Sequence, residues 1–305
     1  MVNYAKTPWP WFGGKADAAA AVWAALGDVE HYVEPFAGSL AVLLRRPHSA
    51  NRPYHSETVN DLDGLLVNAW RSIQMSPDAM ADAASWPVSE ADLMARHLAL
   101  LKWRQERQLE HLMADPLWHD PVMGGWWAWG QSGWIGGGWC SGDGCWVVGD
   151  DGRIAKRVKG EEGVARQRPH LGNGGMGVNY AGTREEGVAR QLPHLGNGGE
   201  GVNRPLMREE GVAIEDRSYH PMTMPELRRW MAFLAARLRH VRILNGDWTR
   251  VVTGAASKIL SVRKAGGHCG VFLDPPYHGD VGRADCYTVD DREVSTAVRE
   301  WAIAH

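Results

Sequence analysis

Four consecutive residues combine two hydrogen-bond acceptors with a flat aromatic ring: Asp274, Pro275, Pro276 and Tyr277. The Asp274 carboxylate is one acceptor, and the Pro275 carbonyl, held by a stiff prolyl backbone, is the other. The exocyclic amino group of a nucleobase has two N–H bonds, which such a pair of acceptors fits. With both bonds held, the nitrogen lone pair leaves conjugation with the ring and can attack an electrophile. The pattern favours this catalytic chemistry over the alternative, a proline-rich turn after a core strand.

A short apolar run over residues 270–273 must position these groups. It is typical of a buried strand, and the two prolines end it because neither has an N–H for a ladder. Open α/β sheets bind their ligands at the carboxyl ends of the strands. We therefore expect Asp274 and Tyr277 at such an end, with the tyrosine ring free to stack on a base.

Two glycine-containing segments near the N-terminus have the form of a nucleotide-like ligand site. Trp11 and two glycines precede an Ala-rich helix expected over residues 16–26, and Lys15 lies at the start of that helix. Residues 31–44 predict an apolar strand, a turn at Gly38 and an apolar helix, the unit that cradles a cofactor. The alternatives are a loop with one solvated lysine and an ordinary turn between a strand and a helix.

Acidic residues follow two further predicted strands. Asp61 and Asp63 precede a helix expected over residues 64–74. An acid at the end of the second strand is where a ribose hydroxyl pair is usually held, which favours Asp61, whereas Asp63 also fits a helix N-cap. Asp247 ends the strand expected over residues 241–248, and its alternative role is that of an exposed turn residue.

Together these motifs resemble the Dam-like class of adenine-specific DNA methyltransferases, whose signature is the Asp-Pro-Pro-Tyr tetrapeptide. The resemblance implies a Rossmann-like sheet that binds S-adenosylmethionine, and transfer of its methyl group to the N6 amino group of adenine in double-stranded DNA. The family often has a second glycine where this chain has Leu40. By resemblance, the residues that hold the methyl donor are Trp11, Lys15, Glu34, Phe36, Gly38, Asp61 and Asp247.

Two other functions stay open. Methylation of cytosine N4 uses the same geometry, and a truncated, catalytically inactive DNA-binding remnant is possible because the chain ends early. The family sheet continues beyond the tetrapeptide strand, whereas the last predicted element here is a helix over residues 290–304. We therefore expect an incomplete sheet with the tetrapeptide strand at its edge. The missing strands would come from a longer or split gene, or from a second chain.

The predicted organisation has three parts. Residues 1–95 form the first, donor-binding part of a methyltransferase domain, and residues 224–305 form its second, catalytic part. Residues 96–223 occupy the place of an inserted target-recognition region. Within it, residues 124–140 are rich in tryptophan and glycine and are read as neither a helix nor a clean strand. Most of these tryptophans are expected to form the core of a small Gly-rich β substructure, with one or two at the DNA surface.

The middle of the chain also carries an internal repeat. A Gly- and Asn-rich unit starts at Glu161 and again at Glu185, 24 residues later, with a decayed copy at Glu209. With few large apolar side chains to stack, it predicts a surface insertion rather than a solenoid. Cys140 and Cys145 have no second ligand pair at zinc spacing, so no metal is expected.

The composition limits how the protein could bind DNA and where in the cell it is expected. The 305 residues carry a formal net charge of -3, so any DNA contact must use local basic patches, one of them at Arg237, Arg239 and Arg242. Four cysteines do not make a disulfide scaffold. There is no signal-peptide pattern, and no apolar run reaches the ~20 residues that span a bilayer. The sequence therefore predicts a cytoplasmic protein without a membrane partner.

Overall fold

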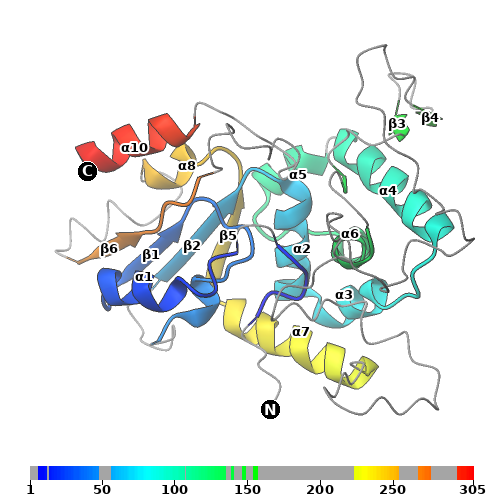
Figure 1. Cartoon of the computed structure of the whole chain (residues 1–305), viewed down its shortest axis with the longest axis horizontal. Helices are drawn as coiled ribbons and strands as arrows, with labels where there is room; N and C mark the ends of the chain where they lie inside the picture. The colour runs from blue at the N-terminus through cyan, green and yellow to red at the C-terminus, as the bar shows by residue number, and fades with distance from the viewer. Residues whose placement is uncertain are drawn as a thin grey trace, which may run out of the picture.

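The main sheet has four parallel strands in the order β5, β2, β1, β6 (Figure 1). This computed structural model describes residues 6–11, 14–47, 56–106, 108–134, 139–140, 146–148, 154–156, 223–253, 267–275 and 294–305. The strands of the main sheet are β1 (His31–Glu34), β2 (Ser56–Asp61), β5 (Val241–Asn245) and β6 (Cys269–Val271). The predicted α/β class is confirmed, and the strand order is compatible with a Rossmann-like fold.

Among the described strands, β6 lies at one end of the sheet, as predicted for the strand that precedes the tetrapeptide. It pairs only with β1, in the register His31 to Cys269 and Val33 to Val271. A separate antiparallel pair joins β3 (Trp146–Val148) and β4 (Ile154–Lys156). The predicted 24-residue repeat falls within residues 161–222, which lie outside the described part of the chain.

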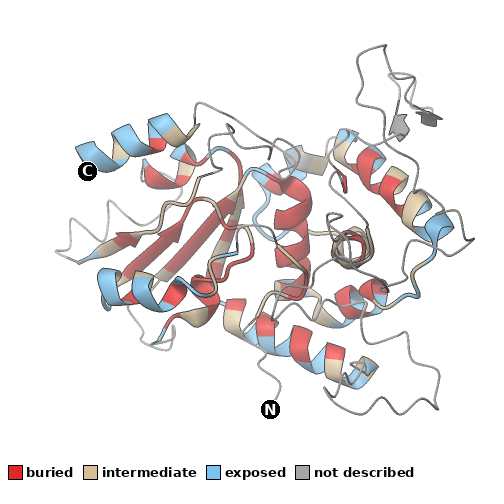
Figure 2. Ribbon diagram, in the orientation of Figure 1, coloured by how far each residue is buried: buried red, intermediate tan, exposed pale blue. Residues whose placement is uncertain are grey.

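Helices pack on both faces of the main sheet, and Figure 2 shows the strands buried between them. Successive residues of a strand point to opposite faces, so Tyr32 belongs to one core and Val33 to the other. The first core includes Trp23 and Trp70, and the second includes Val298. The first core includes residues of α1 (Ala19–Leu26), α2 (Gly64–Met75) and α7 (Met224–Leu238) and continues into further helices beside α2. The second includes residues of α8 (Thr249–Val252) and α10 (Val294–Ala304).

A further group of helices lies beside α2, and one of them, α5, also contacts β5 (Figure 1). Its members are α3 (Pro77–Ala84), α4 (Glu90–Gln105), α5 (Gln108–Ala114) and α6 (Pro121–Gly133). The buried guanidinium of Arg71 joins this group to the sheet, because it donates to the carbonyls of Ile243 and Leu112 at 3.0 and 2.9 Å. The boundary expected between residues 95 and 96 falls inside α4.

The expectation that residues 124–140 form no helix is wrong for the first ten of them, because α6 continues to Gly133. Its glycines are used for close packing. A Cβ on Gly125 would lie 2.4 Å from the Cβ of Ala83, and one on Gly124 would lie 2.9 Å from Ser72 Oγ. The core position expected for most of these tryptophans is confirmed for Trp127 and Trp129, which are buried, but they lie on a helix and not in the expected β substructure. Low helix propensity was thus outweighed by tertiary packing.

Side-chain caps mark where several helices begin. Asp63 accepts from the N–H groups of Leu65 and Leu66, which confirms its alternative role as the N-cap of α2. Asp120 caps α6 in the same way. The start of α7 has a capping box, in which Glu226 reaches back to the N–H of Thr223.

Candidate active site

The carboxyl ends of the parallel strands bring the predicted site residues to one edge of the sheet. Glu34 is the last residue of β1 and Asp61 the last of β2. Asp247 and Asp274 lie two and three residues beyond the ends of β5 and β6. The chain passes from β1 to β2 on one side of β1, and β6 lies on the other side. This reversal of strand order is the position at which open α/β sheets bind ligands.

The N-terminal segment reaches the tetrapeptide directly. Lys15 Nζ lies 2.8 Å from Asp274 Oδ2, and the two side chains are 23% and 25% exposed. Pro275 follows in a half-buried position. Pro276 and Tyr277 lie outside the described residues, so the proposed stacking face stays a prediction. The contact moves Lys15 from a predicted donor ligand to a direct partner of the predicted catalytic carboxylate.

Glu34 is a buried acid beside two other acids. The pKa of Glu34 is raised to about 8, from an ordinary 4.5, mainly by burial and in smaller part by the charges of Asp274 and Asp61. The Tyr32 hydroxyl, which donates to Glu34 Oε2 at 3.1 Å, counteracts part of that rise. The effect of Asp274 and Asp61 on this group means that the three carboxyl groups share one electrostatic site. At pH 7 Glu34 is mostly protonated.

Asp61 joins the turn after β1 to the end of β2. Its Oδ2 accepts from the N–H of Gly38 at 2.9 Å, and its Oδ1 accepts from the N–H of Asp63 at 3.0 Å. Burial raises the Asp61 pKa to about 6, and the hydrogen bonds from these two N–H groups hold it below a still higher value. The predicted ribose ligand and the predicted glycine turn are therefore neighbours.

The turn at Gly38 is shaped by two left-handed residues. Gly38 has φ 46° and Leu40 has φ 53°. A left-handed backbone favours glycine, which explains physically why a glycine would suit the position of Leu40. The apolar helix expected after the turn is wrong, because only the 3-10 turn η1 (Leu43–Arg45) forms there. The 3-10 turn ends at Arg46, which has an extended backbone (ψ 122°) because the residue before a proline is disfavoured from the helical conformation.

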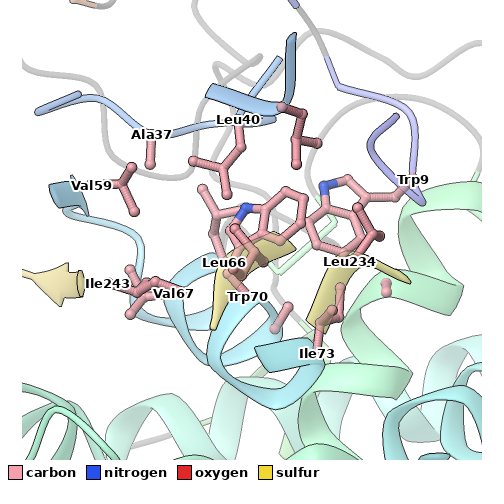
Figure 3. Packing of buried hydrophobic residues seen from close by; sticks show 14 of the residues in the cluster. Trp9, Ala37, Leu40, Val59, Leu66, Val67, Trp70, Ile73, Leu234 and Ile243 are labelled. Carbon is pink, nitrogen blue, oxygen red and sulfur yellow. The ribbon is translucent and has the colours of Figure 1, made fainter. Parts of the chain in front are cut away.

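Tryptophans from three segments pack behind this turn. A Cβ on Gly38 would lie 2.8 Å from Trp11 Nε1, and Trp70 Nε1 donates to the Gly38 carbonyl at 2.9 Å. The Trp9 and Trp70 rings lie 4.6 Å apart, between Leu40 and the residues of α2 (Figure 3). Trp127 of α6 packs against Trp9 at 5.2 Å. The predicted N-terminal motif thus holds the glycine turn from behind.

Phe36 and Asp247 extend the site toward β5. The Phe36 ring stacks on Trp248 with centroids 6.2 Å apart and planes at 28°. Asp247 is exposed, and its Oδ1 accepts from both the N–H and the hydroxyl of Thr249 at the start of α8. Its carboxylate is thus engaged locally, as expected of a turn residue, at the same edge of the sheet as the other acids.

Two residues of the site, Tyr32 and Trp70, were not predicted from the sequence. Tyr32 precedes Glu34 by two residues on a strand, so a shared face was a signal that could have identified it. Trp70 gave no signal, because a tryptophan in an apolar helix is typical of core. Of the predicted basic patch, Arg237 is engaged with Glu57 at 2.7 Å near the amino ends of the strands.

The described residues offer little support for a metal site or a membrane-spanning helix. No group of three or more His, Cys, Asp and Glu side chains in that part of the chain could hold a metal ion. Cys140 is a buried thiol whose pKa is raised by burial, and Cys145 lies outside the described residues. Of the helices described, none has the length and apolar character that crossing a bilayer requires.

Comparison with known proteins adds no assignment. No family model matches the chain, and no curated protein sequence matches it either. The functional conclusion therefore depends on the residues of the site and on their geometry.

Proposed function

We propose that this chain is a Dam-like, S-adenosylmethionine-dependent DNA methyltransferase that modifies the N6 amino group of adenine. The observation that carries the proposal is the meeting of Lys15 and Asp274 at 2.8 Å, beside the acids that end β1 and β2. Motifs that are far apart in the sequence contribute to one site at the strand reversal of a parallel sheet. Cofactor-dependent α/β enzymes use that position.

Two features of the site fit the donor. Gly38 lets Trp11 pack directly against the backbone of the turn, because a Cβ there would lie 2.8 Å from Trp11 Nε1, and this contact brings two predicted donor ligands together. Glu34 is held in its neutral form mainly by burial, and a cationic ligand nearby would favour its ionised form. The groups that would hold the donor are Trp11, Glu34, Phe36, the Gly38 turn, Asp61 and Asp247, whereas Lys15 is paired with Asp274. When bound, S-adenosylmethionine supplies a methyl group on a positively charged sulfur.

The target adenine must leave the helical stack, because its amino group is paired inside the duplex. The Asp274 carboxylate and the Pro275 carbonyl would each accept one N–H of the amino group, with Tyr277 stacked on the base. The proton that the amino nitrogen loses would pass to Asp274. Lys15, already hydrogen-bonded to Asp274 Oδ2, orients this carboxylate for the incoming amino group.

Analysis of the methylated nucleoside tests the proposal. Unmethylated duplex DNA is incubated with the protein and S-adenosylmethionine labelled in its methyl group, and the DNA is digested to nucleosides. The expected product is labelled N6-methyldeoxyadenosine. Label in N4-methyldeoxycytidine would support the related cytosine reaction instead. Donor binding without label in DNA would support a catalytically inactive remnant, and the absence of both would contradict the methyltransferase assignment altogether.

A further inference from the structure

We propose that Asn60 is a positioning residue that fixes the distance between the two turns on either side of the donor site. The proposal rests on the proposed function. Asn60 lies on β2, the strand between β1 and β5, and is fully buried. It uses both hydrogens of its side-chain amide on main-chain carbonyls of other segments.

The two hydrogen bonds cross the sheet in opposite directions. Asn60 Nδ2 donates to the carbonyl of Pro35 at 3.1 Å and to that of Gly246 at 2.8 Å. Pro35 follows the end of β1, and Gly246 follows the end of β5. Both carbonyls lie beyond the last paired residues of their strands. The amide therefore replaces ladder hydrogen bonds at the point where the strands diverge.

The turns that Asn60 joins carry the residues expected to hold the two ends of the donor. The turn after Pro35 contains Phe36 and Gly38, and the turn after Gly246 contains Asp247. Main-chain bonds support the same connection, because the N–H of Ala37 donates to the Asn60 carbonyl at 2.8 Å. A change in the separation of these turns would therefore misplace the donor ligands relative to Asp61.

The side-chain oxygen of Asn60 indicates that this residue is not explained by its contribution to stability alone. Asn60 Oδ1 is buried and finds no hydrogen-bond partner among the described residues. A buried acceptor without a partner is destabilising, and an apolar side chain would avoid it. The side-chain nitrogen Nδ2 makes both hydrogen bonds. If the side-chain amide were rotated by 180°, Oδ1 would instead face the two carbonyl oxygens, and neither bond could form.

Asn68 supplies a matched control. It is also fully buried, on α2, and its amide joins two segments, because it donates to the Asp120 carbonyl at 2.9 Å and accepts from the Asp120 N–H at 2.7 Å. Asp120 begins α6, a helix that carries no predicted donor ligand. Asn60→Ala and Asn68→Ala both remove a buried bridging amide, so both should lower the denaturation midpoint.

The test measures donor affinity by calorimetry, together with KM for the donor and kcat at saturating donor and DNA. For Asn60→Ala we expect Kd and KM to rise by about tenfold, the equivalent of one or two lost hydrogen bonds, while kcat changes by less than about threefold. Asn68→Ala should leave Kd for the donor within about twofold of wild type.

Three other outcomes would contradict the proposed role of Asn60, and a fourth would contradict the proposed function. If Asn60→Ala binds the donor as wild type does, or if Asn68→Ala weakens donor binding equally, Asn60 is not a positioning residue. A lower kcat with unchanged KM in Asn60→Ala also contradicts the assignment. If the wild-type protein binds no donor, the proposed function itself is overturned, and the role of Asn60 with it.

Discussion

The ammonium group of Lys15 lies 2.8 Å from the carboxylate of Asp274, which joins the N-terminal segment to the end of β6. Under the proposed function the contact would orient the carboxylate, because a group that holds an amino group needs a fixed orientation. Its contribution to folding is small, since both side chains are about a quarter exposed and pairs of this kind contribute less than about 1 kcal/mol.

Lys15→Met is therefore expected to reduce methyl transfer by about tenfold or more, which corresponds to about 1.4 kcal/mol of lost orientation. Donor affinity and unfolding midpoint should stay close to wild type. Steady-state rates with labelled donor, calorimetry and urea denaturation measure the three quantities. Lys102→Met is the control, because Lys102 forms an exposed pair with Glu106 at 3.7 Å. Equal rates for the two variants would contradict a role of Lys15 at Asp274.

The raised pKa of Glu34 predicts a pH dependence of stability. Between pH 4.5 and 8 the unfolded chain has released this proton while the folded protein keeps it. The folded state thus binds more protons, and its stability falls as pH rises, by up to about 1.4 kcal/mol per pH unit. Asp61, with a pKa of about 6, acts in the same direction at lower pH.

Glu34→Gln carries no titrating proton, so its stability should fall less steeply than that of wild type between pH 6 and 8. Urea denaturation of both proteins across this range gives the comparison. Donor binding adds a second check, because a cationic donor favours ionised Glu34 and its wild-type affinity should rise with pH in the same window. Parallel stability curves for the two proteins would show that Glu34 does not hold a proton near pH 7.

Gly38→Ala tests the backbone of the turn. The new Cβ would lie 2.8 Å from Trp11 Nε1 at a residue with φ 46°, so the turn must shift. We expect donor affinity to fall by about tenfold, beyond a loss of about 1 kcal/mol of stability from backbone strain. Gly27→Ala is a close control, because Gly27 has φ 70° and nothing lies within 4 Å of its added Cβ. Calorimetry should separate the two variants, and equal donor affinity would remove Gly38 from the site.

Gly125→Ala tests why α6 contains glycines. Alanine has the higher helix propensity, yet its Cβ would lie 2.4 Å from the Cβ of Ala83 on α3. Overpacking of this kind destabilises by about 1–3 kcal/mol, which outweighs a propensity gain of about 1 kcal/mol. At Gly133 the nearest atoms are flexible Val88 methyl groups at 3.2 and 3.3 Å, so Gly133→Ala should be nearly neutral. Greater stability of Gly125→Ala in urea denaturation would contradict the packing argument.

The strands β1, β5 and β6 were predictable because each contains apolar residues ahead of a turn signal, whereas β2 has Val59 as its one apolar residue and was located by the acids at and after its end. Asp61 and Asp274 were expected at the carboxyl ends of strands, whereas Glu34 was proposed from the family resemblance alone. The sheet brings all three to one edge. The contact between Lys15 and Asp274 was not predicted. It depends on the path of the N-terminal segment, which no local pattern determines.

The helix α6 shows where local patterns fail. Glycine and tryptophan are poor helix formers, so residues 124–133 gave no helical signal. The helix forms because its glycines allow close contact with α2 and α3, and because Asp120 caps its first turn. The role of Asn60 was not predicted from the sequence for a related reason. Its role depends on carbonyls of two segments, one of them nearly two hundred residues away in the sequence.

The most direct test of the account is the methyl-transfer rate of Asp274→Ala, measured on a preparation whose donor affinity is also determined. We predict that donor Kd stays within about threefold of wild type while transfer falls at least about a hundredfold, because the amino group of the target loses a charged acceptor. Asp274→Asn, which keeps the size of the side chain and removes its charge, should be similarly impaired. Methyl transfer by Asp274→Ala at a rate close to that of wild type, with the donor bound normally, would contradict the central claim.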